Sequence, residues 1–110
     1  MEVKALARNL PISPKKARLI LDEIRGKRVD EALTILRFMP TPKAKLVAKV
    51  VRSAAANAEN NYSMDPRRLR VVACWAGDAL RLKRLDPRAR GRANILQRRR
   101  CHITIVVDEV

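Results

Sequence analysis

The segment from Arg81 to Arg100 limits the possible fold most strongly, because it is too highly charged to lie in a hydrophobic core. Its twenty residues carry nine Lys or Arg and one acid, Asp86, for a net charge of +8. A structureless loop of that length is uncommon in a compact domain. We therefore expect an extended β-hairpin at about residues 79–100, with its turn between Pro87 and Gly91, where glycine can adopt a positive φ.

A hairpin of this kind needs a partner. An isolated two-stranded ribbon is marginally stable in water, and its like charges repel one another. A polyanion would supply the opposite charge and hold the ribbon in shape. The alternative is a flexible basic loop that serves only solubility.

Composition indicates that the hairpin belongs to a folded protein with an anionic partner. The 110 residues suit a single domain, with a globular body at about 1–78 and 101–110. Lys and Arg number 25 against 11 Asp and Glu, a formal net charge of +14, while 47% of the residues are hydrophobic. The chain therefore has enough apolar residues to form a core. Its excess positive charge makes nucleic acid the leading candidate for the partner.

Other classes of protein have little support. No stretch has the roughly 18 to 20 apolar residues of a membrane helix, and no signal peptide is evident, so we expect a cytoplasmic protein without membrane contact. Cys74 and Cys101 are too few for a disulfide framework, and we interpret them as reduced thiols. With His102 they offer at most three soft ligands, so neither a metal nor a cofactor is expected.

The first half of the chain has the patterns of a short strand and two helices. Weak alternation at residues 3–8 suits a strand. Ser13-Pro14 is a cap followed by proline at the first helical position, and apolar residues then recur at helical spacing until Gly26. Asp30 is the expected cap of a second helix, which Pro40 ends.

A third and longest helix is expected from Thr41-Pro42 to the stop at Asn60-Asn61. Its second half is rich in alanine, which allows close approach either of a sheet inside the protein or of RNA outside it. The four alanines are Ala54, Ala55, Ala56 and Ala58. On another face Lys45, Lys49 and Arg52 form a basic stripe, which is either a nucleic-acid contact or a solvated surface.

After Asp65-Pro66 the period changes to two, which predicts strands. A later run, from Cys101 to Val107, alternates in the same way. The first run predicts one face made of Leu69, Val71, Ala73 and Trp75 and another made of Arg70, Val72, Cys74 and Ala76.

The aromatic residues indicate how nucleic acid would be recognised. Phe38, Tyr62 and Trp75 each lie inside a periodic element or at its end, so no stacking platform for unpaired bases is expected. Arginine outnumbers lysine in the hairpin, and guanidinium groups grip phosphates in a bidentate manner. We infer recognition of folded RNA through its shape and backbone.

Catalysis is not expected. His102 lies in a strand pattern with no Ser or Asp partner fixed by spacing, so packing is the better interpretation. Three glycines do not provide a phosphate-binding loop. The pairs Asp22-Glu23 and Asp30-Glu31 suit helix surfaces.

Three blocks resemble one family, the twenty-second protein of the large ribosomal subunit of bacteria. They are SPKKARLILDEIRGK at residues 13–27, VAKVVRSAAANAENN at 47–61, and LKRLDPRARGRANI through CHITIVV at 82–107. The resemblance covers nearly the whole chain. It implies an α+β fold with three helices on a small antiparallel sheet and a long, protruding basic β-hairpin.

The resemblance also implies a function, that of a structural protein which binds 23S-type rRNA, assists subunit assembly and performs no chemistry. The hairpin would run through the rRNA and line the nascent-peptide exit tunnel beside the fourth protein of the large subunit. The nascent peptide is then a further partner, and the protein is a monomer within the ribosome.

The expected site residues come from the resemblance and from charge. By resemblance, the tunnel-lining tip comprises Lys83, Arg84, Arg88, Ala89, Arg90, Gly91 and Arg92, and the rRNA-facing start of the first helix comprises Ser13, Lys15, Lys16 and Arg18. By charge, further rRNA contacts are expected at Arg25, Lys27, Lys45, Lys49, Arg52, Arg81, Arg98, Arg99 and Arg100.

Two functions from other classes remain as alternatives. An architectural DNA-binding protein could use the basic ribbon as an arm in the minor groove, with Pro87 as a wedge. A small hydrolase would require His102 to be essential. An architectural DNA-binding protein would bind duplex DNA and folded rRNA equally well at the same salt concentration.

Overall fold

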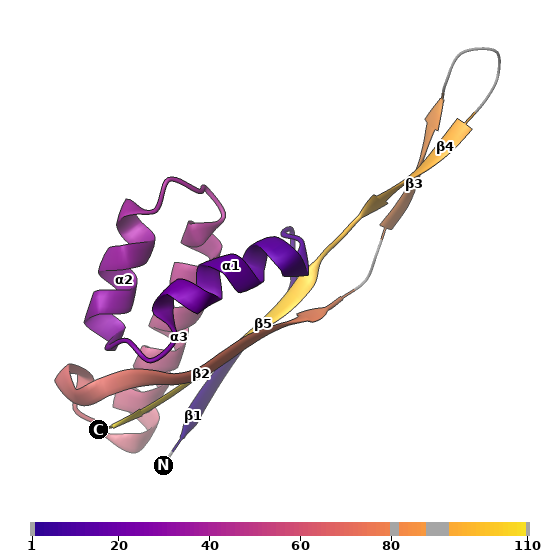
Figure 1. Ribbon diagram of the computed structural model, residues 1–110. Helices are drawn as coiled ribbons and strands as arrows, with labels where there is room; N and C mark the ends of the chain where they lie inside the picture. Colours follow the sequence, from indigo (N-terminus) through magenta and orange to yellow (C-terminus); the bar gives the residue numbers. More distant parts are fainter. Residues whose placement is uncertain (1, 80–81, 88–92, 110) are drawn as a thin grey trace.

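The chain forms a body of helices and strands from which a two-stranded hairpin projects (Figure 1). The structure, a computed structural model, describes residues 2–79, 82–87 and 93–109, and for 82–87 and 93–98 it describes the backbone alone. The described part confirms the expected α+β class, with three helices and an antiparallel three-stranded sheet.

The sheet of the body has its strands in the order β1-β5-β2. These are β1 (Val3–Leu10), β2 (Leu69–Asp78) and β5 (Cys101–Glu109). The central strand β5 is antiparallel to both neighbours, and its pairing with β2 runs from Leu69↔Glu109 to Asp78↔Cys101. Strands are therefore present at all three places where the sequence predicts them in the body.

The hairpin is a separate antiparallel pair between β2 and β5. Its strands are β3 (Leu82–Pro87) and β4 (Ala93–Arg98), in register from Leu82↔Arg98 to Pro87↔Ala93. The Ala79 N–H donates to the Arg100 carbonyl at 3.1 Å. This bond joins the segment that leaves β2 to the segment that enters β5, at the root of the hairpin. The turn expected within residues 87–91 lies, after Pro87, outside the described residues.

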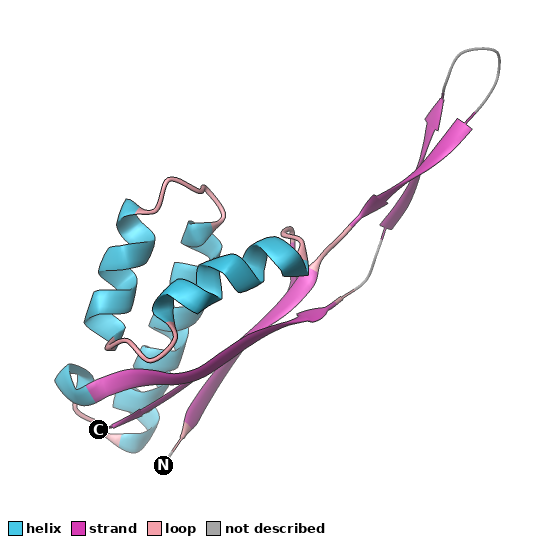
Figure 2. Cartoon of the chain, viewed as in Figure 1, coloured by secondary structure: helices cyan, strands magenta, loops and turns pink. Residues whose placement is uncertain are grey.

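Three helices cover one face of the sheet (Figure 2). They are α1 (Pro14–Ile24), α2 (Val29–Phe38) and α3 (Ala44–Tyr62). The start of α1 is as predicted, because the Ser13 hydroxyl oxygen accepts the Lys16 backbone N–H at 3.4 Å and Pro14 follows the cap. After α1 the chain turns at Gly26, whose φ of 79° favours glycine.

The predicted starts of the other two helices are wrong. α2 begins at Val29 after Arg28, so Asp30 lies in the first turn, where the helix dipole favours its charge, and does not cap the helix. α3 begins at Ala44 and not at Thr41-Pro42. The Thr41 carbonyl instead accepts the Ala44 N–H at 3.1 Å in a turn, and Lys43 is the residue that precedes the helix.

The predicted face of β2 is wrong beyond Val71. The register with β5 shifts between Val71 and Ala73, which indicates a β-bulge at Val72. One extra residue reverses the alternation, so Cys74 and Ala76 are buried while Trp75 is 47% exposed. Strict period-two reasoning cannot detect an inserted residue whose side chain is itself apolar.

The core lies between the helices and the inner face of the sheet. α1 contributes Leu21, and β5 contributes Ile103 and Ile105, all fully buried. In the alanine-rich half of α3, Ala54 and Ala58 are fully buried and the helix contacts β1 and β5. Packing on the sheet is therefore the correct interpretation of these two alanines.

Two leucines of α1 test this packing. Leu21 is fully buried and Leu19 is 65% exposed, so the same substitution removes core contacts at one position only. We expect Leu21→Ala to lower the free energy of unfolding by about 2–5 kcal/mol and Leu19→Ala to change it by less than about 0.5 kcal/mol. Urea denaturation followed by circular dichroism measures both, and equal losses would contradict this core.

Candidate nucleic-acid interface

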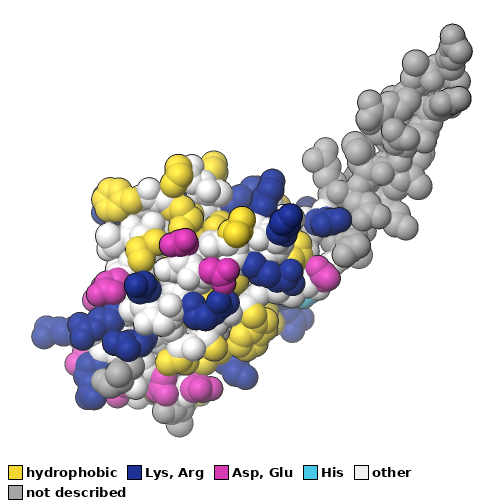
Figure 3. Space-filling model, in the orientation of Figure 1, with side chains coloured by type: hydrophobic (Ala, Val, Ile, Leu, Met, Phe, Trp, Pro, Cys, Tyr) yellow, Lys and Arg dark blue, Asp and Glu magenta, His cyan; other side chains and the backbone are white. Residues whose placement is uncertain are grey.

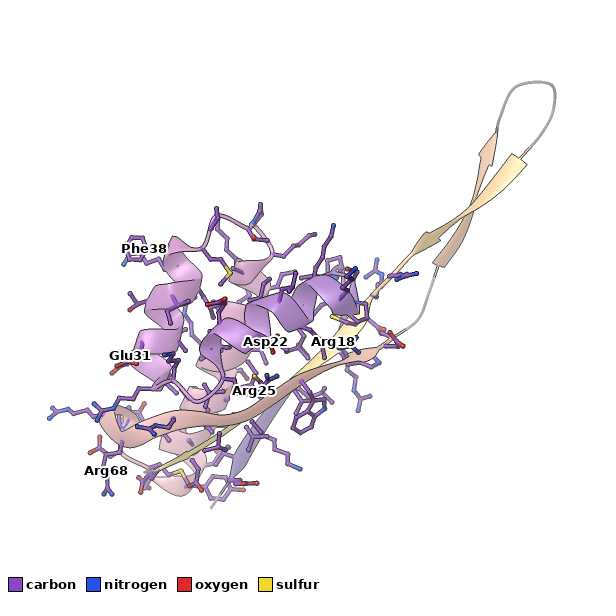
Figure 4. The ribbon with its side chains drawn as sticks, in the orientation of Figure 1. Arg18, Asp22, Arg25, Glu31, Phe38 and Arg68 are labelled. Atoms are coloured by element: carbon purple, nitrogen blue, oxygen red, sulfur yellow. The ribbon has the colours of Figure 1, made fainter. Side chains whose placement is uncertain are left out.

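Arg18 of α1 and Arg25, the C-cap residue that follows it, fasten the helix to the sheet. The Arg18 guanidinium donates to the Ala76 carbonyl at 3.1 Å, and that of Arg25 donates to the Cys74 carbonyl at 2.9 Å. Figure 4 shows both arginines on the side of α1 toward β2. Both residues are exposed. They therefore present positive charge at the surface while they donate hydrogen bonds to backbone carbonyls of β2.

Arg25 also forms an ion pair with Asp22 on the same helix, at 2.6 Å between Nη1 and Oδ1 (Figure 4). The hydrogen bond to Asp22 raises the pKa of Arg25 above its usual value. Because part of its charge is neutralised within the protein, Arg25 is a weaker candidate for phosphate binding than Lys15 or Lys16, which are exposed on the same helix. Ser13 has a structural role as the helix cap.

The basic stripe of α3 lines a groove. A cavity of about 610 Å³ lies between α2, the loop after it and α3, with Leu33, Leu36 and Ala48 among its apolar lining. The groove is also lined by all three cations of the basic stripe, which the sequence places on one face of the helix: Lys45, Lys49 and Arg52. We call this cavity the α2–α3 groove.

Arg37 completes the basic lining of the α2–α3 groove, and sequence reasoning missed it. Its guanidinium lies 5.7 Å from the centre of the Phe38 ring, a cation–π distance. None of the described residues that line the groove is acidic. The sequence did contain a signal for Arg37. It lies in the last turn of the second helix, beside the loop that leads to the basic stripe.

A second groove of about 560 Å³ lies on the other side of the α2–α3 loop. Lys16 and Lys43 line it together with Glu23 and the exposed Leu19. The two grooves share Met39, Pro40 and Thr41, so the start of α1 and the basic stripe of α3 flank one loop. Figure 3 shows Lys and Arg side chains over α1 and at the root of the hairpin.

The structure places only part of the predicted hairpin site. Lys83, Arg84 and Arg98 belong to the β3–β4 pair by backbone position. Arg99 is exposed, and the Arg100 guanidinium donates to the Asn9 carbonyl at 3.1 Å. Outside the described residues lie Arg81, Arg88, Ala89, Arg90, Gly91 and Arg92. The remaining predicted contact, Lys27, is exposed after α1.

The three aromatic side chains are exposed at the surface. Phe38, Tyr62 and Trp75 are 76%, 51% and 47% exposed, although each does lie within an element or at its end. Membership of a periodic element does not bury a side chain that points away from the core. Aromatic surface is therefore available to a partner.

His102 and the cysteines have structural surroundings. The His102 Nδ1 accepts the Asn9 backbone N–H at 3.1 Å, which joins β1 to β5 where their register shifts. Cys74 and Cys101 are free, as expected, and both are buried. Burial raises the pKa of each thiol and so favours the protonated, unreactive form.

The described residues contain no group of three or more His, Cys, Asp or Glu that could hold a metal ion. Among the helices of this part of the chain, none has the length and hydropathy needed to cross a membrane.

Comparison with known proteins gives a consistent result. Residues 5–108 match the family described as ribosomal protein L22p/L17e. The large ribosomal subunit protein uL22 of Thermoanaerobacter sp. (strain X514) is 55% identical over 109 residues, which cover 99% of this chain and 98% of the relative. Those of Dehalococcoides mccartyi (strain CBDB1) and Thermotoga sp. (strain RQ2) are each 51% identical over 99% of this chain, covering 100% and 69% of the relative.

The α2–α3 groove predicts a distinct contribution to RNA affinity. We expect the double variant Lys49→Gln, Arg52→Gln to reduce the slope of log affinity against log salt by about 2, one for each lost phosphate contact. The measurement is filter binding to an rRNA transcript at several salt concentrations. A matched control, Arg28→Gln with Arg67→Gln, removes the same charge from exposed residues outside the groove. Equal changes in the two variants would contradict a specific role for the groove.

Proposed function

Since the chain belongs to the ribosomal protein L22p/L17e family, we propose that it binds 23S-type rRNA and that its hairpin lines the nascent-peptide exit tunnel. Its family identifies it as a structural component of the large ribosomal subunit and not as an enzyme. This confirms the resemblance drawn from its sequence and the expected location in the ribosome. The hydrolase alternative is thereby removed.

The hairpin gives the strongest support for rRNA binding. Its β3–β4 backbone pair is separate from the sheet of the body, and no described helix covers it (Figure 1). The segment 81–100 contains nine of the 25 Lys and Arg residues but a single acid. A thin ribbon with this charge is favoured when phosphates surround it, because they neutralise its self-repulsion.

The basic surface of the body supports the same proposal. The two grooves beside the α2–α3 loop bring Lys16 from α1 together with Lys45 and Lys49 from α3. Cations from separate elements therefore line two grooves that flank one loop, which suits a phosphate backbone better than isolated surface charges do. No comparable observation favours duplex DNA over RNA.

The position in the exit tunnel rests on the shape of the molecule and on its family. A narrow arm can pass between rRNA helices while the wider body remains outside. We propose that the tip, including Arg88, Arg90 and Arg92, lies beside the fourth protein of the large subunit and meets the nascent peptide. The protein then acts as a monomer and assists assembly by holding rRNA segments on both sides of the arm.

Shortening the arm tests rRNA binding. If about eight phosphates are neutralised, log affinity for an rRNA transcript falls against log salt with a slope of about −6 to −7. Replacing residues 82–98 with Asn-Gly removes six cations, so we expect a slope shallower by about 4 to 5. Because the β3–β4 pair is separate from the sheet of the body, the variant should unfold at nearly the temperature of the parent. An unchanged slope would contradict the arm as the main RNA contact.

Cross-linking tests the tunnel position. The native thiols are buried, so a photo-cross-linker attached at Arg90→Cys labels the tip selectively. We expect it to cross-link to the nascent chain in stalled ribosomes, whereas a label at Glu23→Cys, exposed on α1 of the body, should not. Cross-links from the body but not from the tip would contradict the proposed orientation.

A further inference from the structure

The sheet has a second face that no described helix covers (Figure 2). Along β5 the core residues Ile103, Ile105 and Val107 point toward the helices, so Thr104 points outward, as does Val106, which is buried on the outer face. Leu6, Thr104 and Trp75 lie opposite one another across β1, β5 and β2, in one row on this outer face. Leu6 is 51% exposed and Trp75 is 47% exposed, so the row is open to a partner.

The bulge at Val72 is what turns Trp75 outward. Without the extra residue, Trp75 would share the face of Leu69 and Val71, both buried in the core. Bulges commonly redirect a side chain next to a functional site. Val72 itself is 40% exposed, which enlarges the apolar surface around the tryptophan.

Cations flank this row. Lys4 and Arg8 are exposed and lie two residues before and two residues after Leu6 on the same side of β1. Arg70, near the far end of the outer face, has a buried Nε with no hydrogen-bond partner among the described residues. Asp108 lies opposite Arg70 and therefore away from Trp75.

The nature of the partner follows from charge and chemistry. A second copy of this chain would bring together two molecules of net charge +14, so self-association through this face is disfavoured. A nucleobase offers a flat apolar surface to Trp75, polar edges to the Thr104 hydroxyl, and adjoining phosphates to Lys4 and Arg8. Exposed aromatics on a sheet with basic neighbours are the means by which several folds bind unpaired bases.

We propose that the outer sheet face binds an unpaired RNA base stacked on Trp75, with Lys4 and Arg8 on the phosphates beside it. This inference rests on the proposed function, because it assumes that RNA is the partner, and it adds a mode of recognition that differs from backbone contact. The hairpin and the grooves recognise the charge and shape of the RNA backbone. The outer sheet face instead binds a nucleotide whose base is not stacked on its neighbours in the RNA.

Trp75 is the single tryptophan of the chain, so its fluorescence reports on this face alone. The full-length protein is titrated with a 12-nucleotide oligoadenylate and with an abasic ribose-phosphate 12-mer of equal charge. Anisotropy of a label on each oligonucleotide follows binding independently. We expect oligoadenylate to quench Trp75 emission at saturation and the abasic 12-mer to leave it unchanged.

Variants at the same position measure the contribution of stacking. The ratio of oligoadenylate affinity to abasic 12-mer affinity should be about 5 to 160 in the parent, because stacking on one aromatic contributes about 1–3 kcal/mol per base. Trp75→Leu should reduce this ratio to near 1, whereas Trp75→Phe should retain most of it. Phe38→Leu, which removes an exposed aromatic away from the sheet, should leave it unchanged.

The possible failures are distinguishable. If neither oligonucleotide changes in anisotropy while the rRNA transcript still binds, the stacking site is overturned and the proposed function stands. If the transcript does not bind either, the proposed RNA binding fails and this inference fails with it. If both bind equally well and Trp75 emission does not change, RNA binding stands and the stacking site is overturned, which leaves a protein surface as the partner of this face. The fluorescence result uses the parent chain, so it does not depend on the folding of a variant.

Discussion

The pairing of β5 with both β1 and β2 is the interaction on which the rest of the structure depends. β1 and β2 do not pair with each other, so the sheet exists only through its central strand. The inner face of β5, with Ile103 and Ile105 fully buried, is also the floor on which the helices pack. Because β2 and β5 are antiparallel neighbours, the chain that connects them must leave and re-enter at one end of the sheet, and the arm projects from that end.

Charge and packing are separated along this chain. Among the residues whose side chains are described, no polar or charged residue is buried, so the core is entirely apolar. Arg18 and Arg25 are an intermediate case, since their guanidinium groups hold α1 on β2 while their charge remains at the surface. In the described part of the body, the cations therefore lie at the surface of an apolar core.

Much of this architecture could be predicted from the sequence, because each correct element had a local physical signal. Ser13-Pro14 specifies a helix start, and the density of cations at 81–100 predicts a hairpin, whose β3–β4 backbone pair the structure describes. The local cap signals at Asp30 and Thr41-Pro42 misplaced two helix starts by two residues each. The other errors arose where a signal was not local. The bulge at Val72 depends on pairing with a distant strand, and the contribution of Arg37 to the α2–α3 groove depends on how two helices pack. Exposure of Trp75 follows from the bulge, so it could not be foreseen from alternation.

The position of β5 after the arm has a consequence for biosynthesis. During synthesis β1 and β2 leave the ribosome well before the strand that must lie between them, and the basic arm is made in the interval. The helices can form early, but their sheet stays incomplete until the arm has been translated. A newly made chain therefore presents its cations before it has a finished body, and a chain interrupted within the arm has no sheet at all.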